Sequence, residues 1–186
     1  MRARTKQLTL AGILAGLGVV LLLLGAFLQV LDLSAAALAS LLIVVAVIEL
    51  SPIFPILIYL VTGLLALLLL PDKLAALVYL ALTGYYPIAK CYVERIKPVF
   101  ATMLKFLLFN LSLSAILGVG VWLLSLDLSF SGTRLAGYGF WAILVLYLVG
   151  NLVFWMYDIL LSRFARIYQN RLRRRFGMDR FFENTK

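Results

Sequence analysis

The chain has 186 residues, of which 65% are apolar and 13% are charged, and its formal net charge is +9. Soluble domains average roughly 45–50% apolar and about 25% charged residues, so this composition excludes a water-soluble globule and predicts an integral membrane protein. There is no histidine and only one cysteine, Cys91, which excludes a disulfide framework and any cysteine-based zinc or iron–sulfur site. We therefore predict no metal and no cofactor.

Continuous apolar runs mark the membrane spans, because a helix needs about 20 such residues to cross the hydrocarbon. In chain order the predicted spans are 8–30, 33–50, 52–70, 74–92, 99–124 and 138–161. Pro52 and Pro55 lie at the start of the third run. A partly re-entrant hairpin is therefore the alternative to two full crossings by the second and third spans. The prediction is an all-α membrane protein, a six-transmembrane-helix bundle over 1–162 followed by a basic amphipathic cytoplasmic tail over 163–186.

The basic residues predict the orientation of the bundle, since Lys and Arg concentrate on the cytoplasmic side. In a six-span arrangement, 15 of the 17 cations fall on the side that holds both termini, and Lys73 and Arg134 fall on the other. We expect a multi-pass protein of a bacterial cell (plasma) membrane with its N- and C-termini in the cytoplasm. The net positive charge is thus a topology signal, and nucleic acid is not an expected partner.

The C-terminal segment 163–186 mixes arginines with aromatic and aliphatic residues. This composition is typical of a helix that leaves the bilayer and lies on anionic headgroups. A docking surface for a cytoplasmic partner is the alternative.

Charged residues near the spans do not predict a buried cluster. Lys90 and Glu94 are spaced for a local i, i+4 pair, and Asp158 lies close to Arg163 in the sequence. Glu49 and Lys105 fall within a turn or two of the cytoplasmic face, where long side chains can reach water. No nucleotide-binding glycine loop or histidine-based catalytic set is present, so we do not expect an enzyme.

Small residues define one candidate surface, at the cytoplasmic end of the first span. Alanines and glycines repeat there one helical turn apart, at Ala11, Gly12, Ala15 and Gly16. Small residues at this spacing let another helix approach closely. The partner is either a separate protein, which makes this a partner-docking face, or another helix of the same bundle.

Aromatic and amide residues in the later spans define a second candidate surface. The predicted substrate-binding set is Tyr79, Trp122, Tyr138, Trp141 and Asn151. A largely apolar pocket with a few polar groups is the usual form of a small-molecule site. The alternative is an aromatic belt at the bilayer interface.

The basic N-terminus, the Ala11-x-x-x-Ala15 motif and the six-span topology together resemble the S components of energy-coupling factor (ECF) transporters. The resemblance covers the whole chain in topology and length, and its residue-level motif is short. It implies a non-enzymatic substrate-capture subunit that binds a vitamin or other micronutrient near the outer face. It also implies partners: a transmembrane coupling subunit and ABC-type ATPases, besides membrane lipid.

This chain departs from those proteins in one respect, since the connection after its first span is very short. The candidate pocket residues are poor in charge, which favours a neutral or hydrophobic substrate. Two other functions stay open: a structural or regulatory membrane subunit whose basic tail docks a cytoplasmic partner, and a lipid-active protein using Glu49, Glu94 or Asp158.

Overall fold

The computed structural model describes residues 2–28, 31–71, 73–123 and 139–172, and all regular structure within these ranges is helical. In chain order the elements are α1 (Arg2–Leu28), α2 (Asp32–Glu49), α3 (Ile53–Leu69), α4 (Lys73–Val78), the π-helix η1 (Tyr79–Thr83), α5 (Tyr86–Val93), α6 (Pro98–Leu123), α7 (Gly139–Ile167) and the π-helix η3 (Tyr168–Leu172). The all-α prediction is confirmed for the described part of the chain.

Four helices of the described chain are long and apolar enough to cross a membrane: Arg4–Leu28, Asp32–Glu49, Pro98–Val119 and Ile143–Arg171. The helix α3 is also apolar but has 17 residues, which at the usual helical rise gives it a length of about 25 Å. The predicted fourth span is not one continuous α-helix, because it is divided into α4, η1 and α5. Helix α7 continues past residue 162, so the predicted boundary between the bundle and the tail falls inside a helix. Residues 173–186 of the predicted tail lie outside the described ranges.

Pro87 and the π-helix before it account for the divided fourth segment. In η1 the Gly84 N–H donates to the carbonyl of Tyr79 at 2.7 Å, which is five residues back instead of four. Pro87 has no N–H, so the carbonyl of Thr83 loses the donor that a regular α-helix would provide. The segment therefore keeps its direction but leaves backbone acceptors open in its middle.

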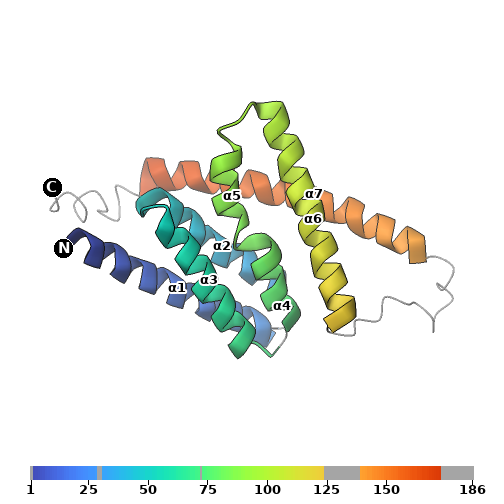
Figure 1. Ribbon diagram of the computed structural model, residues 1–186, viewed down its shortest axis with the longest axis horizontal. Helices are drawn as coiled ribbons and strands as arrows, with labels where there is room; N and C mark the ends of the chain where they lie inside the picture. Colours follow the sequence, from blue (N-terminus) through green and yellow to red (C-terminus); the bar gives the residue numbers. More distant parts are fainter. Residues whose placement is uncertain (1, 29–30, 72, 124–138, 173–186) are drawn as a thin grey trace.

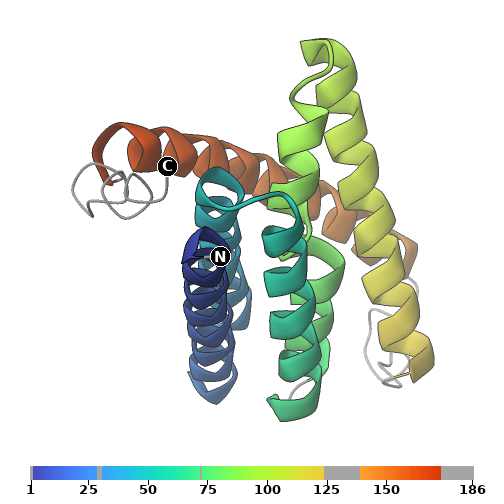
Figure 2. The ribbon, with the colours of Figure 1, turned by 60° about the vertical axis from the view of Figure 1, so that its left-hand side comes forward.

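The segments from α1 to α6 alternate in direction along the molecule (Figures 1 and 2). One end of the molecule holds the end of α1, the start of α2, the end of α3 and the start of α4 (Figure 1). The opposite end holds the start of α1 and the turns α2–α3 and α5–α6. Helix α7 crosses the others obliquely and ends on the side where α1 begins (Figure 2).

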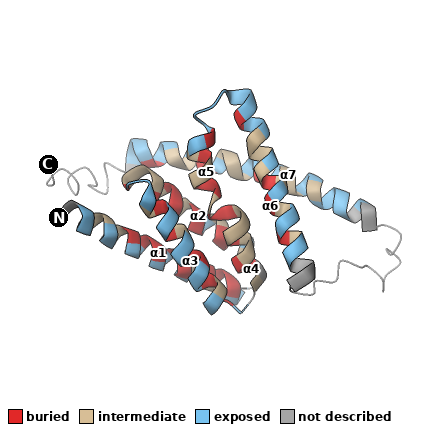
Figure 3. Cartoon of the chain, viewed as in Figure 1, coloured by how far each residue is buried: buried red, intermediate tan, exposed pale blue. Residues whose placement is uncertain are grey.

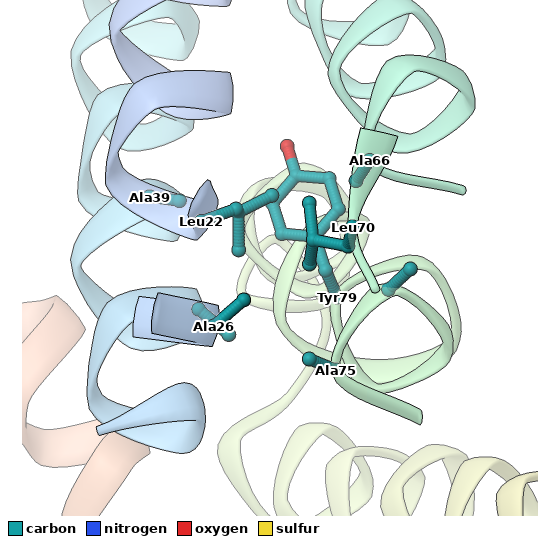
Figure 4. Packing of buried hydrophobic residues seen from close by; sticks show 9 residues of the cluster. Leu22, Ala26, Ala39, Ala66, Leu70, Ala75 and Tyr79 are labelled. Atoms are coloured by element: carbon teal, nitrogen blue, oxygen red, sulfur yellow. The ribbon is translucent and has the colours of Figure 1, made fainter. Parts of the chain in front are cut away.

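One cluster of the core lies between α1, α2, α3 and the α4–η1 segment, around Leu22, Leu70 and Tyr79 (Figure 4). Many of its other members are alanines, which let helix backbones approach closely in a membrane. The helices α1 and α2 approach closely, since a Cβ added to Gly25 would lie 2.4 Å from the Cβ of Ala35. Small side chains thus set the spacing of these helices.

Helix α7 differs from the others in how little of it is buried (Figure 3). In its most apolar 18-residue stretch 6% of the residues are buried, against 44% in the corresponding stretches of α1 and α2. Apolar packing therefore contributes less to the position of α7 than to that of the other long helices. Its polar contacts, described next, hold it in place.

Candidate functional site

A hollow of about 510 Å³ opens between α2, η1, α6 and α7. Its walls are mostly apolar, and they include Leu33, Phe109 and Phe154. The rings of Phe109 and Phe154 are stacked, with centroids 4.5 Å apart. Three hydroxyl-bearing residues interrupt this apolar lining: Ser34, Thr83 and Tyr157. We refer to this hollow as the α2–α7 groove.

Hydroxyl groups from other helices meet the backbone acceptors of η1. The Tyr59 hydroxyl donates to the carbonyl of Leu80 at 2.8 Å. The Tyr157 hydroxyl lies 2.7 Å from Ser40 Oγ and 3.2 Å from the carbonyl of Thr83, the one that Pro87 leaves without a helical donor. The π-helix is therefore held by tyrosines from α3 and α7.

The Thr83 side chain is different, because its hydroxyl has no hydrogen-bond partner although the residue is only 3% exposed. A threonine in a helix normally donates to the carbonyl three or four residues back. Here the carbonyl of Tyr79 already accepts from Gly84, and the carbonyl of Leu80 already accepts from Tyr59. A buried hydroxyl without a partner is uncommon and costly; Thr83 lines the α2–α7 groove with other atoms, since its hydroxyl oxygen is fully covered.

The residues of the predicted substrate-binding set have different surroundings. Tyr79 is 1% exposed and packs inside the core cluster (Figure 4), whereas Trp141 is 59% exposed. Asn151 exchanges two hydrogen bonds with Asn110 of α6, at 3.0 and 3.1 Å. None of these residues lines the α2–α7 groove; the side chain of Trp122 and the whole of Tyr138 lie outside the described part.

The predicted docking residues divide between two faces of α1. Ala11 and Ala15 are buried and pack in a cluster with residues of α2 and α3, and Thr62 of α3 donates to the carbonyl of Ala15 at 3.4 Å. Gly12 and Gly16 lie on an open face, since a Cβ added to either would have no atom within 4 Å. The alanines therefore pack against other helices of the same chain. The partner-docking role stays a prediction, and of its four residues Gly12 and Gly16 are the accessible ones.

Four charged residues form a closed ring between α5, α6 and α7, and the prediction that no charged cluster is buried here is wrong. Lys90 pairs with Glu94 at 3.3 Å and with Asp158, while Lys105 pairs with Glu94 at 2.7 Å and with Asp158 at 3.2 Å. Lys90 is only 6% exposed. We call Lys90, Glu94, Lys105 and Asp158 the ionic ring.

The ionic ring is neutral, and its members have few hydrogen-bonding positions left. Lys90 Nζ also donates to the carbonyl of Asp158 at 2.8 Å and to Ser162 Oγ at 2.7 Å, and the Tyr86 hydroxyl donates to Asp158 Oδ1 at 2.7 Å. Paired charges with satisfied hydrogen bonds are typical of a structural contact in a membrane protein. A second hollow, of about 550 Å³, lies beside the ring and is lined by Lys90, Glu94, Lys105 and Arg166 among others.

One sequence signal pointed to the ring. Its two lysines and two acids fall in three consecutive predicted spans or at their ends, each near the end that the charge pattern predicts to be cytoplasmic. The i, i+4 pair of Lys90 and Glu94 was expected and is present. The contacts to Lys105 and Asp158 depend on how α6 and α7 pack, which spacing along one helix does not reveal.

Comparison of the chain with protein-family models, with curated proteins and with solved structures finds no match.

Proposed function

We propose that the chain is a six-span membrane subunit that captures a small ligand within the bilayer and passes it to an energised partner, in the manner of the S components of ECF transporters. The observation that carries this proposal is the α2–α7 groove. Its volume of about 510 Å³ falls within the roughly 300–1,000 Å³ of ordinary ligand sites. The groove combines apolar walls with a few hydroxyls, as such sites do.

The alternating direction of the segments supports the six-span topology. When α4, η1 and α5 are taken as one crossing, the segments from α1 to α6 alternate in direction, and α7 lies across them and returns to the side where α1 begins (Figures 1 and 2). Arg4, Lys6, Arg95 and Lys97 belong to the end where α1 begins and α5 meets α6. Under the positive-inside rule this end is cytoplasmic, and the start of the groove at Leu33 then belongs to the outer half.

Thiol labelling in whole cells tests this topology. In a Cys91→Ser background, a cysteine at exposed Ser51, between α2 and α3, should react only after the membrane is permeabilised. A cysteine at exposed Leu31, between α1 and α2, should react with an impermeant reagent in intact cells. Labelling of both positions from outside would contradict the six-span topology.

Ligand capture is tested by purifying the tagged protein in a mild detergent and analysing the bound small molecules by mass spectrometry. The test variant is Ala37→Phe, which places a ring in the groove. Its matched control is Leu38→Phe, one residue further on the same helix, where the side chain is exposed and outside the groove. A metabolite retained by the wild type and the control but lost from Ala37→Phe supports capture. If all three carry only the same bulk phospholipid, the groove is not a ligand site.

The same preparation tests the partners. We expect a membrane coupling subunit and two ATPases to co-purify, and Gly12→Leu with Gly16→Leu to release them while the ligand stays bound. These glycines are the appropriate positions because bulky residues at Ala11 and Ala15 would disturb internal packing. Loss of an unrelated cytoplasmic protein on deletion of 173–186 would instead favour the structural or regulatory alternative.

The lipid-active alternative receives less support from the acidic residues. Glu94 and Asp158 each pair with both lysines of the ionic ring, which favours a structural role for these carboxylates. A phospholipid-scrambling or hydrolytic activity that disappears in Glu94→Gln and Asp158→Asn, in protein that remains folded, would reverse this conclusion.

A further inference from the structure

We propose that the hollow beside the ionic ring binds the headgroup of an anionic phospholipid, with its phosphodiester on Arg166 and Lys105. This hollow of about 550 Å³ lies between α5, α6 and α7. The inference is independent of ligand capture, because the hollow shares no lining residue with the α2–α7 groove. It depends on three observations: the charge of the hollow, the hydrogen-bonding positions left open in it, and its place at the end of the spans.

The charge of the hollow matches one negative charge. Three of its four charged lining residues belong to the ionic ring, which Asp158 makes neutral. The fourth is Arg166, which is exposed and makes no ion pair or hydrogen bond with another residue of the described ranges. The hollow and the ring together therefore have a net charge of +1. A phosphodiester group with a single negative charge balances it, whereas a zwitterionic headgroup brings no net charge.

Two cations have donors left for a phosphate. Lys105 Nζ donates to Glu94 Oε1 at 2.7 Å and to Asp158 Oδ2 at 3.2 Å, so one of its three N–H bonds is unused. The Lys105 side chain is 13% exposed. The guanidinium of Arg166 has five donors in a planar fork that fits two phosphate oxygens at once. Lys90, by contrast, already donates to three oxygen atoms of Asp158 and Ser162.

Glu94 is the one acid in the lining, and it selects the rest of the headgroup. Both of its contacts to the ring lysines fall on Oε1, so Oε2 can accept a further hydrogen bond. Because the two lysines already balance its charge, a neutral donor is sufficient. A headgroup that combines one phosphodiester with a hydroxyl group, as in phosphatidylglycerol, meets both requirements.

The position of the hollow favours a lipid over free phosphate. Pro98 lines the hollow and is the first residue of α6, a candidate membrane span. The start of a span lies at the bilayer boundary, where phospholipid phosphates are found, and basic pockets between helices at this depth bind anionic headgroups. Val99 and Met103 are exposed on the same part of α6. They offer an apolar surface to the acyl chains, which inorganic phosphate lacks.

The test counts the phospholipids that stay on the purified protein. The tagged full chain is reconstituted in liposomes of equal parts phosphatidylcholine, phosphatidylethanolamine and phosphatidylglycerol, extracted in a mild detergent and analysed by mass spectrometry. We expect enrichment of phosphatidylglycerol over the other two lipids. Arg166→Gln should lower this retention about fivefold, the effect of one basic residue near an anionic headgroup. The matched control is Arg163→Gln, since Arg163 is exposed on the same helix outside the lining, and it should retain the lipid.

A second pair of variants tests the hollow by its volume. Thr102 is exposed and lines the hollow, whereas its neighbour Met103 is exposed and does not. Thr102→Phe should therefore exclude the lipid, and Met103→Phe should keep it. Neither Arg166 nor Thr102 belongs to the ionic ring, so in phosphatidylcholine alone their variants should unfold at the temperature of the wild type. Added phosphatidylglycerol should raise that temperature only where the hollow is intact.

Each other outcome overturns the assignment. Retention of the three lipids in the proportions supplied would show that the hollow does not select a headgroup, and enrichment of phosphatidylethanolamine would refute the charge argument. Equal losses in Arg166→Gln and Arg163→Gln would show a diffuse surface attraction. Displacement of the lipid by inorganic phosphate would show that the site recognises phosphate alone. Ala37→Phe should not change the retention of phosphatidylglycerol, so the test is separate from that of ligand capture.

Discussion

The ionic ring gives the sharpest prediction about stability, because its two acids differ in burial and in the number of donors they serve. The Asp158 carboxylate accepts from Tyr86, Lys90 and Lys105, and its side chain is 20% exposed. Within the described ranges the Glu94 carboxylate accepts a hydrogen bond from Lys105 and forms an ion pair with Lys90, and its side chain is 48% exposed. Removal of Asp158 should therefore cost far more than removal of Glu94.

The magnitude follows from what each change leaves behind. Losing one member of a buried ion pair costs about 3–5 kcal/mol, and Glu94 remains beside both lysines to offset part of this after Asp158→Asn. We therefore expect Asp158→Asn to lower the free energy of unfolding by about 2–3 kcal/mol. Glu94→Gln affects a largely solvated pair, and its cost should be at most about 1 kcal/mol.

The measurement is unfolding by SDS in mixed micelles, followed by tryptophan fluorescence. The single variant Lys90→Met and the double variant Lys90→Met with Asp158→Asn complete a cycle with Asp158→Asn. The loss in the double variant should be smaller than the sum of the two single losses, because Lys105 and Glu94 are then left as a matched pair. Equal costs for Asp158→Asn and Glu94→Gln would refute the reasoning, as would strict additivity in the cycle.

Two further predictions concern helix packing. Gly25→Ala should destabilise the protein by about 1–3 kcal/mol in the same SDS titration, because the added methyl overlaps Ala35. The control Gly12→Ala, on the same helix, places its methyl in open space and should be neutral or slightly stabilising. Asn110→Leu and Asn151→Leu should each cost about 1–2 kcal/mol, and the double variant should cost less than their sum, because each single variant leaves the other amide without its partner on the facing helix. Additive losses in the double variant would show that the reciprocal bonds do not matter.

The helices were predictable where apolar runs are bounded by polar or proline residues. The predicted span 33–50 differs by one residue at each end from α2, and 99–124 by one residue at each end from α6. The fourth span was predicted as a single helix and is interrupted by η1. A proline inside a helix always frees a carbonyl, but the sequence does not reveal that the carbonyl of Thr83, freed by Pro87, accepts from Tyr157 on the last helix.

The candidate site was harder to predict, because aromatic and small residues serve packing as readily as binding. Tyr79 combines an apolar ring with a polar end, and both a pocket and a core use such a side chain. Ala11 and Ala15 show the helix-packing pattern, and the structure uses them inside the bundle. Thr83 gave no sequence signal, since the burial of its hydroxyl without a partner depends on how the helices pack.

The position of Asp158 on the last helix also affects biogenesis. During synthesis Lys90 and Lys105 enter the membrane before their acid partner exists, with only Glu94 beside them. The charges of this region balance only when α7 arrives, so a chain truncated before α7 carries an excess positive charge at the membrane and an incomplete set of hydrogen bonds. Because α7 buries so few of its apolar residues, the polar contacts of the ring are the clearest difference between the folded chain and one that lacks α7.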